Sequence, residues 1–295
     1  MLDGNFESAW RESDAIRTRG APDPHRLWNG EDLTGSRVIV RCLHGLGDAV
    51  QMLQYAPRIA AIASHVVYEA PPRFLSIAPC FYGVENVITW GDQAPARPPL
   101  WDVQLEIMEL PHIFRTQQAQ LPITTNYLEL PTQAVKNAAS AMGASCGPRV
   151  GLVWACGAWN PQRSIPFPLL KSLLALEGIE FWNLQGDAAA LDAHGLPIRD
   201  AAAVCGEGLL PLAATIADLD LVITPDTLAA HLAGALGKPA WVMLQYAADW
   251  RWMLDREDTP WYPTLRLFRQ ASQGDWPSVV DAVRNALQEW AARRH

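Results

Sequence analysis

Short apolar runs typical of β-strands alternate with helix-like segments along this chain, and the alternation occurs in two successive blocks. The first block has a run at residues 38–43, a helix-like segment over 48–62 and a second run at 65–69. The second block begins at 149–154 and continues to a run at 240–244. Strands joined by helical crossovers lie parallel in one sheet. The sequence therefore predicts an α/β protein with two parallel-sheet domains and a ligand in the cleft between them, beyond the carboxyl ends of the strands.

A change of composition divides the two blocks. Around residues 131–148 the chain becomes rich in Ala, Ser and Gly, which predicts a domain boundary. An amphipathic helix with Phe6 and Trp10 on one side precedes the first block and ends at a Pro-rich break over residues 21–24; a final helix has Asp275 as its expected N-cap. The predicted organisation is a helical leader at 1–30, an N-terminal domain at 31–145, a C-terminal domain at 146–275 and a C-terminal helix at 276–295.

Composition excludes several classes of protein. The 295 residues are 49% hydrophobic and contain no apolar run of 18 residues, which argues against a disordered chain and against a membrane span. A formal charge of -8 argues against non-specific binding of nucleic acid, which needs a basic surface. The five cysteines show no C-x-x-C spacing, and the first residues show no secretory signal, so a reducing, cytoplasmic location is expected.

The first candidate site is the glycine turn Gly45-Leu46-Gly47-Asp48 between a predicted strand and a predicted helix. A dinucleotide-binding turn would need Gly or Ala at Val50, although Glu69 stands where a ribose-binding acid would be. It would also place pyrophosphate beside Asp48, and two unit charges 4 Å apart repel by about 1 to 4 kcal/mol. A carboxylate facing a cleft is instead well placed to accept a proton from a substrate hydroxyl. The alternative is that Asp48 only caps its helix.

The second candidate site lies at residues 224–231, where a strand ends and a helix begins. Free backbone N–H groups and the positive end of the helix dipole favour an anion there. Thr227 and His231 are four residues apart on one helix face, within reach of a diphosphate. The alternative is that Asp226 is only the N-cap and His231 a packed core residue. Arg163, in a polar loop after the first strand of the second block, is placed to neutralise a phosphate.

Five segments together resemble a known family. In order, they are GLGDAVQMLQY at 45–55, RVGLVWA at 149–155, RSIP at 163–166, DTLAAHLAGALG at 226–237 and DWRWMLDREDTPWYPTLRLFRQ at 249–270. They resemble glycosyltransferase family 9, the ADP-heptose heptosyltransferase family, and in particular its branch attached to tetratricopeptide repeats. The leader at 4–11 is similar to the last helix of such an array, but no 34-residue repeat can be counted.

The resemblance covers nearly the whole chain and implies a GT-B fold, in which two Rossmann-like domains with parallel sheets face a central cleft. It further implies metal-independent, inverting transfer of a sugar from a nucleotide diphosphate to an acceptor hydroxyl, with no cofactor. ADP-heptose is one candidate donor, and the acceptor would be a glycan, lipopolysaccharide or a protein. The pair Asp218 and Asp220 resembles the metal-binding D-x-D of some sugar transferases, but its place at the start of a strand disfavours that role.

Roles follow from the resemblance residue by residue. Asp48 would be the general base. The nucleotide diphosphate would be held by Arg163, Asp226, Thr227 and His231, with Gln185 near the base. The acceptor or donor-sugar side would include His44, Gly45, Gly47, Trp250 and Arg251. Simple packing of the tryptophans is the alternative for the segment 246–252.

Two residues depart from the family pattern: Leu228 stands where the heptosyltransferases have Gly, and His44 replaces the usual Gln before the glycines. Two other hypotheses stay open on the sequence. One is a nucleotide-sugar-binding or interaction module of the same fold without catalysis. The other is a nicotinamide-dependent oxidoreductase, which Asp48 and Val50 disfavour.

Overall fold

The computed structural model describes residues 1–19, 28, 30–91, 100–186 and 188–294. The chain divides into two compact units, Met1–Glu129 (unit 1) and Leu130–His295 (unit 2). The Pro-rich break predicted at residues 21–24 lies outside the described residues.

Unit 1 is built on a four-stranded sheet with the strand order β3-β2-β1-β4, and every pair of strands is parallel. The predicted helix over 48–62 is interrupted, because Pro57 has no N–H to continue the hydrogen-bond ladder. In chain order, the strands and helices are α1 (Phe6–Arg19), β1 (Arg37–Arg41), α2 (Leu46–Met52), α3 (Ala56–Ala60), β2 (His65–Ala70), β3 (Val87–Thr89), β4 (Val103–Glu106) and α4 (Leu110–Ile113).

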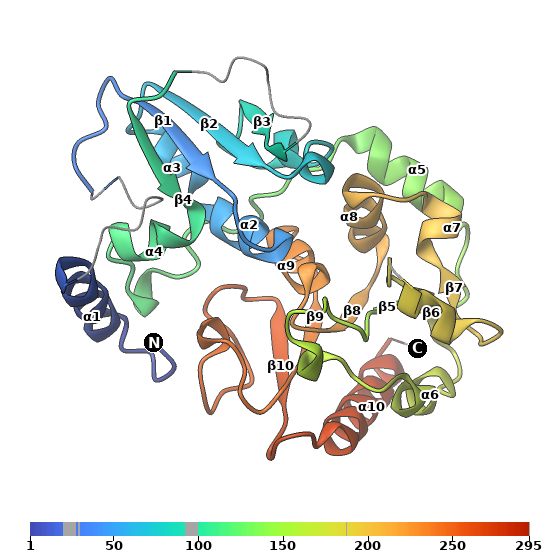
Figure 1. Ribbon diagram of the computed structural model, residues 1–295. Coiled ribbons are helices and arrows are strands. Elements are labelled where there is room, and N and C mark those ends of the chain that lie inside the picture. The colour runs from blue at the N-terminus through green and yellow to red at the C-terminus, as the bar shows by residue number, and fades with distance from the viewer. Residues whose placement is uncertain (20–27, 29, 92–99, 187, 295) are drawn as a thin grey trace. The chain divides into compact units, whose positions relative to one another are not determined.

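Unit 2 is built on a six-stranded sheet with the strand order β10-β9-β8-β5-β6-β7, again entirely parallel. Helices α5, α7, α8 and α9 form one group on the sheet, and α6 packs with α10 as another (Figure 1). In chain order, its elements are α5 (Thr132–Met142), β5 (Arg149–Leu152), α6 (Phe167–Leu174), β6 (Glu180–Asn183), β7 (Arg199–Asp200), α7 (Ala201–Cys205), α8 (Leu209–Asp218), β8 (Leu221–Pro225), α9 (Leu228–Ala235), β9 (Ala240–Leu244), β10 (Leu265–Arg269) and α10 (Trp276–Ala292).

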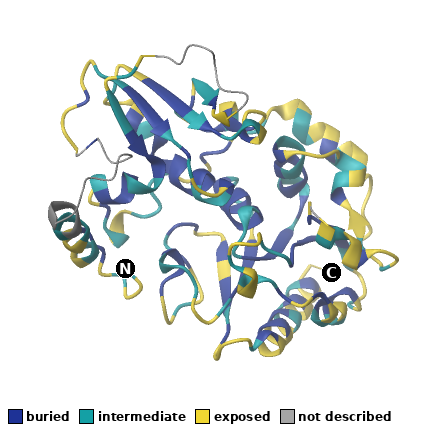
Figure 2. Ribbon diagram, viewed as in Figure 1, coloured by how far each residue is buried: buried dark blue, intermediate teal, exposed yellow. Residues whose placement is uncertain are grey.

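The predicted alternation of strands and helices is confirmed in both units. All residues of β5, β8 and β9 are buried, as expected of parallel strands covered on both faces, whereas α5 and α10 each expose one side (Figure 2). Asp275 is the N-cap of α10, and its carboxylate accepts the N–H of Ser278 at 3.2 Å. Gly237, with φ of +68°, ends the turn after α9, where the N–H of Lys238 donates to the carbonyl of Ala233 at 2.8 Å.

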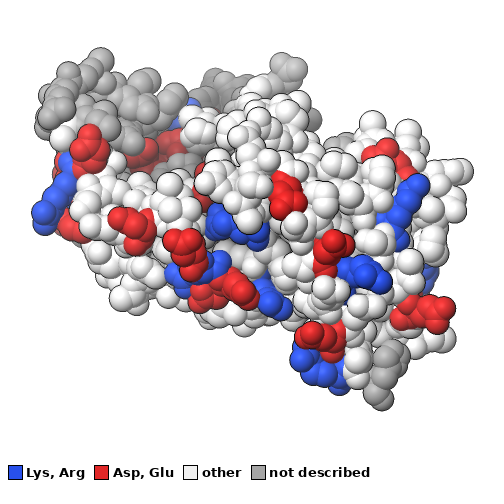
Figure 3. Space-filling view, turned by 90° about the horizontal axis from the view of Figure 1, so that it is seen from below, with Lys and Arg blue, Asp and Glu red and all other residues white. Residues whose placement is uncertain are grey.

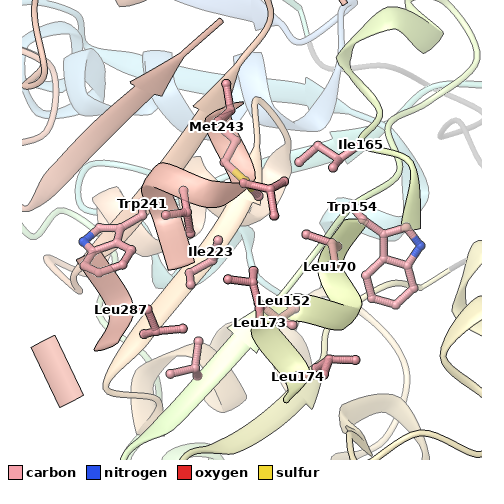
Figure 4. Packing of buried hydrophobic residues seen from close by; sticks show 14 of the residues in the cluster. Leu152, Trp154, Ile165, Leu170, Leu173, Leu174, Ile223, Trp241, Met243 and Leu287 are labelled. Carbon is pink, nitrogen blue, oxygen red and sulfur yellow. The ribbon is translucent and has the colours of Figure 1, made fainter. Parts of the chain in front are cut away.

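The main core of unit 2 lies between its sheet and the pair α6 and α10. Leu152, Ile223 and Met243 point from neighbouring strands toward Leu170 and Leu287 on the two helices, and all five are almost fully buried (Figure 4). Alternate residues of each strand supply this face, because successive side chains of a strand point to opposite sides. One face of the sheet is thereby packed against α6 and α10.

The division between the units falls at 129/130, not at the predicted 145/146. The Ala-rich composition near residue 140 belongs to α5, which packs on α7 and α8 of unit 2. Ala138 and Met142 are its buried residues, and Arg199 donates to the carbonyl of Met142 at 2.8 Å. Small residues that resemble a linker in the sequence therefore let a helix pack closely.

Helix α1 is part of unit 1 and not a separate leader. Trp10 is 2% exposed, and its indole N–H donates to the carbonyl of Thr116 at 2.8 Å. Asp14 lies 2.9 Å from Nε2 of His112 and 2.6 Å from the guanidinium of Arg115. These contacts fix the helix against α4 and the turn that follows it.

Several exposed charges are paired with one another. Figure 3 shows Lys and Arg side chains beside Asp and Glu on one face of the molecule. Arg256 lies 2.7 Å from Asp258, and Arg266 lies 3.1 Å from Glu257. Among the helices described, none combines the length and the apolar character that crossing a bilayer requires.

Replacing Trp10 by Ala tests whether α1 stabilises unit 1. We expect the free energy of unfolding to fall by about 3 kcal/mol or more, because the substitution leaves a cavity and removes a buried hydrogen bond. Arg11→Ala, on the exposed side of the same helix, is the control and is expected to change stability by less than about 0.5 kcal/mol. Equal denaturation midpoints for the two variants would contradict the packing role of α1.

Candidate functional site

In unit 2, three segments meet where β5 and β8 end: the loop after β5, the end of β8 and the start of α9. Arg163 lies in the 3-10 helix η7 (Pro161–Arg163), and its Nη1 donates to the backbone carbonyl of Asp226 at 2.9 Å. The same nitrogen is 3.7 Å from the carboxylate of Asp226. Ser164 holds the loop by accepting the N–H of Cys156 at 2.9 Å. The structure thus brings together two residues that are 63 positions apart in the chain.

Asp226 is a largely buried carboxylate, with its side chain 13% exposed, and it is surrounded by cationic and donor groups. Burial by itself would raise its pKa, but a hydrogen bond and the charge of His231, the charge of Arg251 and the indole N–H of Trp252 outweigh that effect. Together they lower the pKa of Asp226 to about 2. Asp226 is therefore ionised at neutral pH and holds the surrounding cations in place.

His231 is buried in the interior of unit 2 at 2% exposure. Its Nε2 is 3.6 Å from Asp226, its Nδ1 is 3.1 Å from the hydroxyl of Tyr262, and its ring stacks on Trp252 with centroids 5.7 Å apart. The imidazole is thus fixed on both ring nitrogens and orients Asp226. Direct contact between this imidazole and a diphosphate stays a prediction.

The N-cap of α9 is Thr227, and the alternative that Asp226 is the cap is wrong. The hydroxyl oxygen of Thr227 accepts the N–H of Ala229 at 3.3 Å and lies 2.7 Å from the hydroxyl of Thr224. Because Thr227 caps the helix, the carboxylate of Asp226 interacts instead with the cations around it. The positive end of the α9 dipole therefore lies next to the contact between Asp226 and Arg163.

Gln185 follows β6 and is tied to the backbone after β5. Its side-chain oxygen accepts the N–H of Ala155 at 3.0 Å and that of Trp154 at 3.3 Å, and its amide nitrogen donates to the carbonyl of Ala155 at 3.3 Å. These bonds couple the two strand ends beside the site. A contact with a nucleotide base stays a prediction for Gln185.

Trp250 and Arg251 lie in the 3-10 helix η9 (Trp250–Trp252). Arg251 is buried at 7% exposure, and its Nε donates to Asp249 at 2.8 Å. Trp250 packs edge-on against Trp261 with centroids 5.8 Å apart. Arg251 is therefore one of the groups around Asp226. Trp250 packs within unit 2, as the alternative interpretation of this segment expected. A sugar contact stays a prediction for both residues.

In unit 1, the predicted glycine turn precedes α2, with Gly45 as its N-cap and Gly47 and Asp48 in the first turn. The N–H of Gly45 donates to Oδ2 of Asp48 at 3.0 Å, so Asp48 caps its helix as the simpler alternative proposed. A carboxylate offers about four lone-pair sites, so a capping bond does not by itself exclude a second role for Asp48. His44 is exposed directly before this turn and lies 3.7 Å from Glu106.

The acidic residues considered for dinucleotide binding and for a metal-binding D-x-D motif form ion pairs in the structure. Glu69, the expected ribose-binding acid, accepts a hydrogen bond from Arg41 at 2.9 Å. Asp218 is paired with Arg149, and Asp220 is 2.8 Å from Arg294. These contacts anchor strand ends, which gives the acidic residues a structural role.

Two residues of these sites were missed by the sequence analysis. Tyr262 holds His231 from 31 positions away, and no local pattern indicates such a partner. Glu106 ends β4 at the same edge of the sheet as the glycine turn. A carboxylate at the carboxyl end of a predicted strand was the available signal.

Comparisons with known proteins bear on the fold. No protein-family model matches the chain. Protein FlbA of Caulobacter vibrioides is 30% identical over 301 aligned positions, which cover 91% of this chain and 49% of FlbA. The chain therefore spans about half the length of the curated relative it matches.

Solved structures with a similar fold include three glycosyltransferases. One is a family 9 glycosyltransferase from Veillonella parvula, with a TM-score of 0.61 and 13% identity over 90% of this chain and 100% of that chain. Another is E. coli heptosyltransferase WaaC with ADP-2-deoxy-2-fluoro heptose, with a TM-score of 0.56 and 15% identity over 86% and 100% of the two chains. The third is E. coli ADP-heptose lipopolysaccharide heptosyltransferase II, with a TM-score of 0.62 and 13% identity over 88% and 99%.

These likenesses confirm the predicted fold class, a GT-B type α/β fold with two parallel sheets. At such low identities, they establish the fold and not the reaction. The attachment to tetratricopeptide repeats stays a prediction.

Replacing Gly234 by Ala tests the packing that fixes His231. A Cβ at Gly234 would come closer than 3.0 Å to three ring carbons of Tyr262. We expect the free energy of unfolding to fall by about 1 to 3 kcal/mol through overpacking, although Ala favours a helix by about 1 kcal/mol. Gly157→Ala is the control, since a Cβ there meets nothing within 4 Å. A Gly234 variant as stable as this control would contradict the close packing.

Proposed function

We propose that this protein is a glycosyltransferase that moves a sugar from a nucleotide diphosphate to an acceptor hydroxyl, with inversion at the anomeric carbon and without a metal ion. The observation that carries the proposal is the contact between Arg163 and Asp226 at the start of α9. It places a guanidinium beside a helix N-terminus at the carboxyl edge of a parallel sheet, an arrangement suited to a diphosphate.

Arg163 retains hydrogen-bonding capacity for a ligand. Nη1 makes the bond to Asp226, and Nε is buried without a hydrogen-bond partner among the residues described. A diphosphate oxygen would satisfy such a donor. As the bond between the sugar and the diphosphate breaks, negative charge grows on the leaving group, and Arg163 and the α9 dipole would stabilise it.

Asp48 is the proposed general base. Its position in the first turn of α2 fixes the carboxylate through the bond from Gly45. In the proposed reaction, Asp48 takes the proton of the acceptor hydroxyl while that oxygen attacks the anomeric carbon and the nucleotide diphosphate departs with the bonding electrons. Because attack and departure occur on opposite faces of the sugar, the configuration inverts.

A second candidate is a nucleotide-sugar-binding module of the same fold without transfer. The observation that favours it is the capping bond of Asp48, which gives this carboxylate a sufficient structural reason to be present. Measuring donor hydrolysis and transfer on the intact chain separates the two candidates. Suitable acceptors are a lipopolysaccharide core oligosaccharide, a peptide rich in Ser and Thr, and a methyl glycoside.

The donor is proposed to carry ADP, with heptose as one candidate sugar, by analogy with the ligand in the WaaC structure. A thermal-shift series with ADP, UDP, GDP and CDP tests the base. A ligand at 100 times its dissociation constant adds about 2.7 kcal/mol of stability. A cytoplasmic location is part of the proposal, and it is supported by all five cysteines being free thiols.

Arg163→Ala is expected to weaken binding of the preferred nucleoside diphosphate about tenfold or more, because a charged hydrogen-bond donor to the phosphates is lost. Arg293→Ala, on the exposed end of unit 2, should leave the affinity unchanged. Isothermal titration calorimetry provides both dissociation constants. Equal affinities would overturn the assignment of the diphosphate site.

Asp48→Asn is expected to lower turnover at least about 100-fold, since general bases contribute roughly 100- to 10,000-fold. Nucleotide affinity should change less than about twofold, and Asn preserves capping. Asp32→Asn, which alters an exposed carboxylate that accepts the N–H of Thr34, is the matched control. Undiminished turnover in the Asp48 variant would remove Asp48 from the proposed mechanism.

A further inference from the structure

Glu106 is a buried carboxylate at the carboxyl edge of the sheet of unit 1. It ends β4 and pairs in register with Arg41 on β1, the strand that leads into the glycine turn. Its residue is 5% exposed, and its Oε2 accepts the N–H of Met108 at 2.7 Å. The same oxygen lies 3.7 Å from Nε2 of His44.

His44 has one ring nitrogen close to Glu106, and its side chain is otherwise open to solvent. Its side chain is 60% exposed, although the carboxylate that it faces is buried. The next residue, Gly45, donates its N–H to Asp48, so His44 and the proposed base Asp48 lie on the same turn. An acceptor molecule at Asp48 would therefore meet His44.

The surroundings of Glu106 leave it poorly neutralised. Burial raises the pKa of Glu106 to about 7, and the charge of Glu109 adds to the rise, while the N–H groups of Met108 and Leu43 and the charge of His44 oppose it. Other titratable or charged groups lie on the elements packed around this region. They are Arg41, Cys42 and His44 from β1 and its turn, Asp48 from α2, Glu109 from η5 (Ile107–Glu109) and His112 from α4. Arg41 is paired with Glu69 of β2, and His112 lies 3.8 Å from Glu109.

We propose that His44 binds the acceptor at this turn and that Glu106 is the positioning residue that holds its imidazole. This inference rests on the proposed function and leaves Asp48 as the base. The ring nitrogen turned away from Glu106 would hydrogen-bond an oxygen of the acceptor, next to the hydroxyl that Asp48 deprotonates. Glu106 acts only through His44, since it is buried and does not reach the acceptor.

The pairing is tested without activity by carbon-13 NMR of the Glu106 carboxyl group in the full chain. Its titration midpoint is expected near pH 7 in the parent protein and at higher pH in His44→Gln, because that change removes the charge that lowers the pKa of Glu106. Glu85→Gln, at an exposed position of unit 1, should leave the midpoint unchanged. An unchanged midpoint in the His44 variant overturns the pair.

The binding role is tested by kinetics with the acceptor from the series above that is glycosylated. His44→Gln and Glu106→Gln are each expected to raise the acceptor KM about tenfold, with the nucleotide dissociation constant unchanged. The double variant should be no worse than His44→Gln, since Glu106 acts through His44. Additive losses, or a loss of nucleotide affinity, would overturn the positioning role. A chain that neither transfers sugar nor hydrolyses donor would overturn the proposed function itself, whereas the NMR titration still decides the pair.

Discussion

Burial of the Asp226 carboxylate is the constraint on which the site in unit 2 depends. An isolated charge in the interior costs several kcal/mol, so the carboxylate persists only because partners from separate segments surround it. Arg163 comes from the loop after β5, His231 from α9, and Arg251 from the segment after β9. Tyr262 fixes His231 in turn, and Gly234 provides the space for the Tyr262 ring. A single, largely buried charge therefore holds three segments of unit 2 around it: the loop after β5, α9 and the segment after β9.

The pKa of Glu106, the buried carboxylate of unit 1, is shifted in the opposite direction from that of Asp226. Cationic and donor groups lower the pKa of Asp226 to about 2, whereas burial and Glu109 raise the pKa of Glu106 to about 7. The difference follows from the cationic partners: Asp226 has the buried Arg251 nearby, whereas the imidazole 3.7 Å from Glu106 belongs to the exposed His44. Asp226 keeps its charge throughout the physiological range, while Glu106 changes its charge within that range. Environments that push two carboxyl pKa values apart are a means of giving two carboxylates different tasks.

Much of this arrangement follows from local sequence patterns. Hydrophobic periodicity predicted several of the strands, including β9 at its observed bounds, and it predicted the helix that begins after Asp275. It did not predict β7 and β10, the two edge strands of the sheet of unit 2. The proximity of Arg163 and Asp226 was implied by the family resemblance, which assigned both residues to one diphosphate site. The domain boundary could not be predicted, since α5 becomes a packed helix only in contact with α7 and α8. The partnership between Tyr262 and His231 was likewise hidden, because it depends on tertiary contacts across 31 residues.

Net charge is a poor guide to the anion site that we propose. The chain carries a formal charge of -8, and within the site Arg163 faces Asp226 while Arg251 donates to Asp249. Two arginines are thus offset by two carboxylates, and the local excess of positive charge is small. Binding of a diphosphate would then depend on directed donors, namely the guanidinium of Arg163 and the first turn of α9, more than on bulk attraction. Such donors are effective only when they are held rigidly. Arg163 is held by Asp226, whose backbone carbonyl accepts its hydrogen bond and whose carboxylate lies 3.7 Å away.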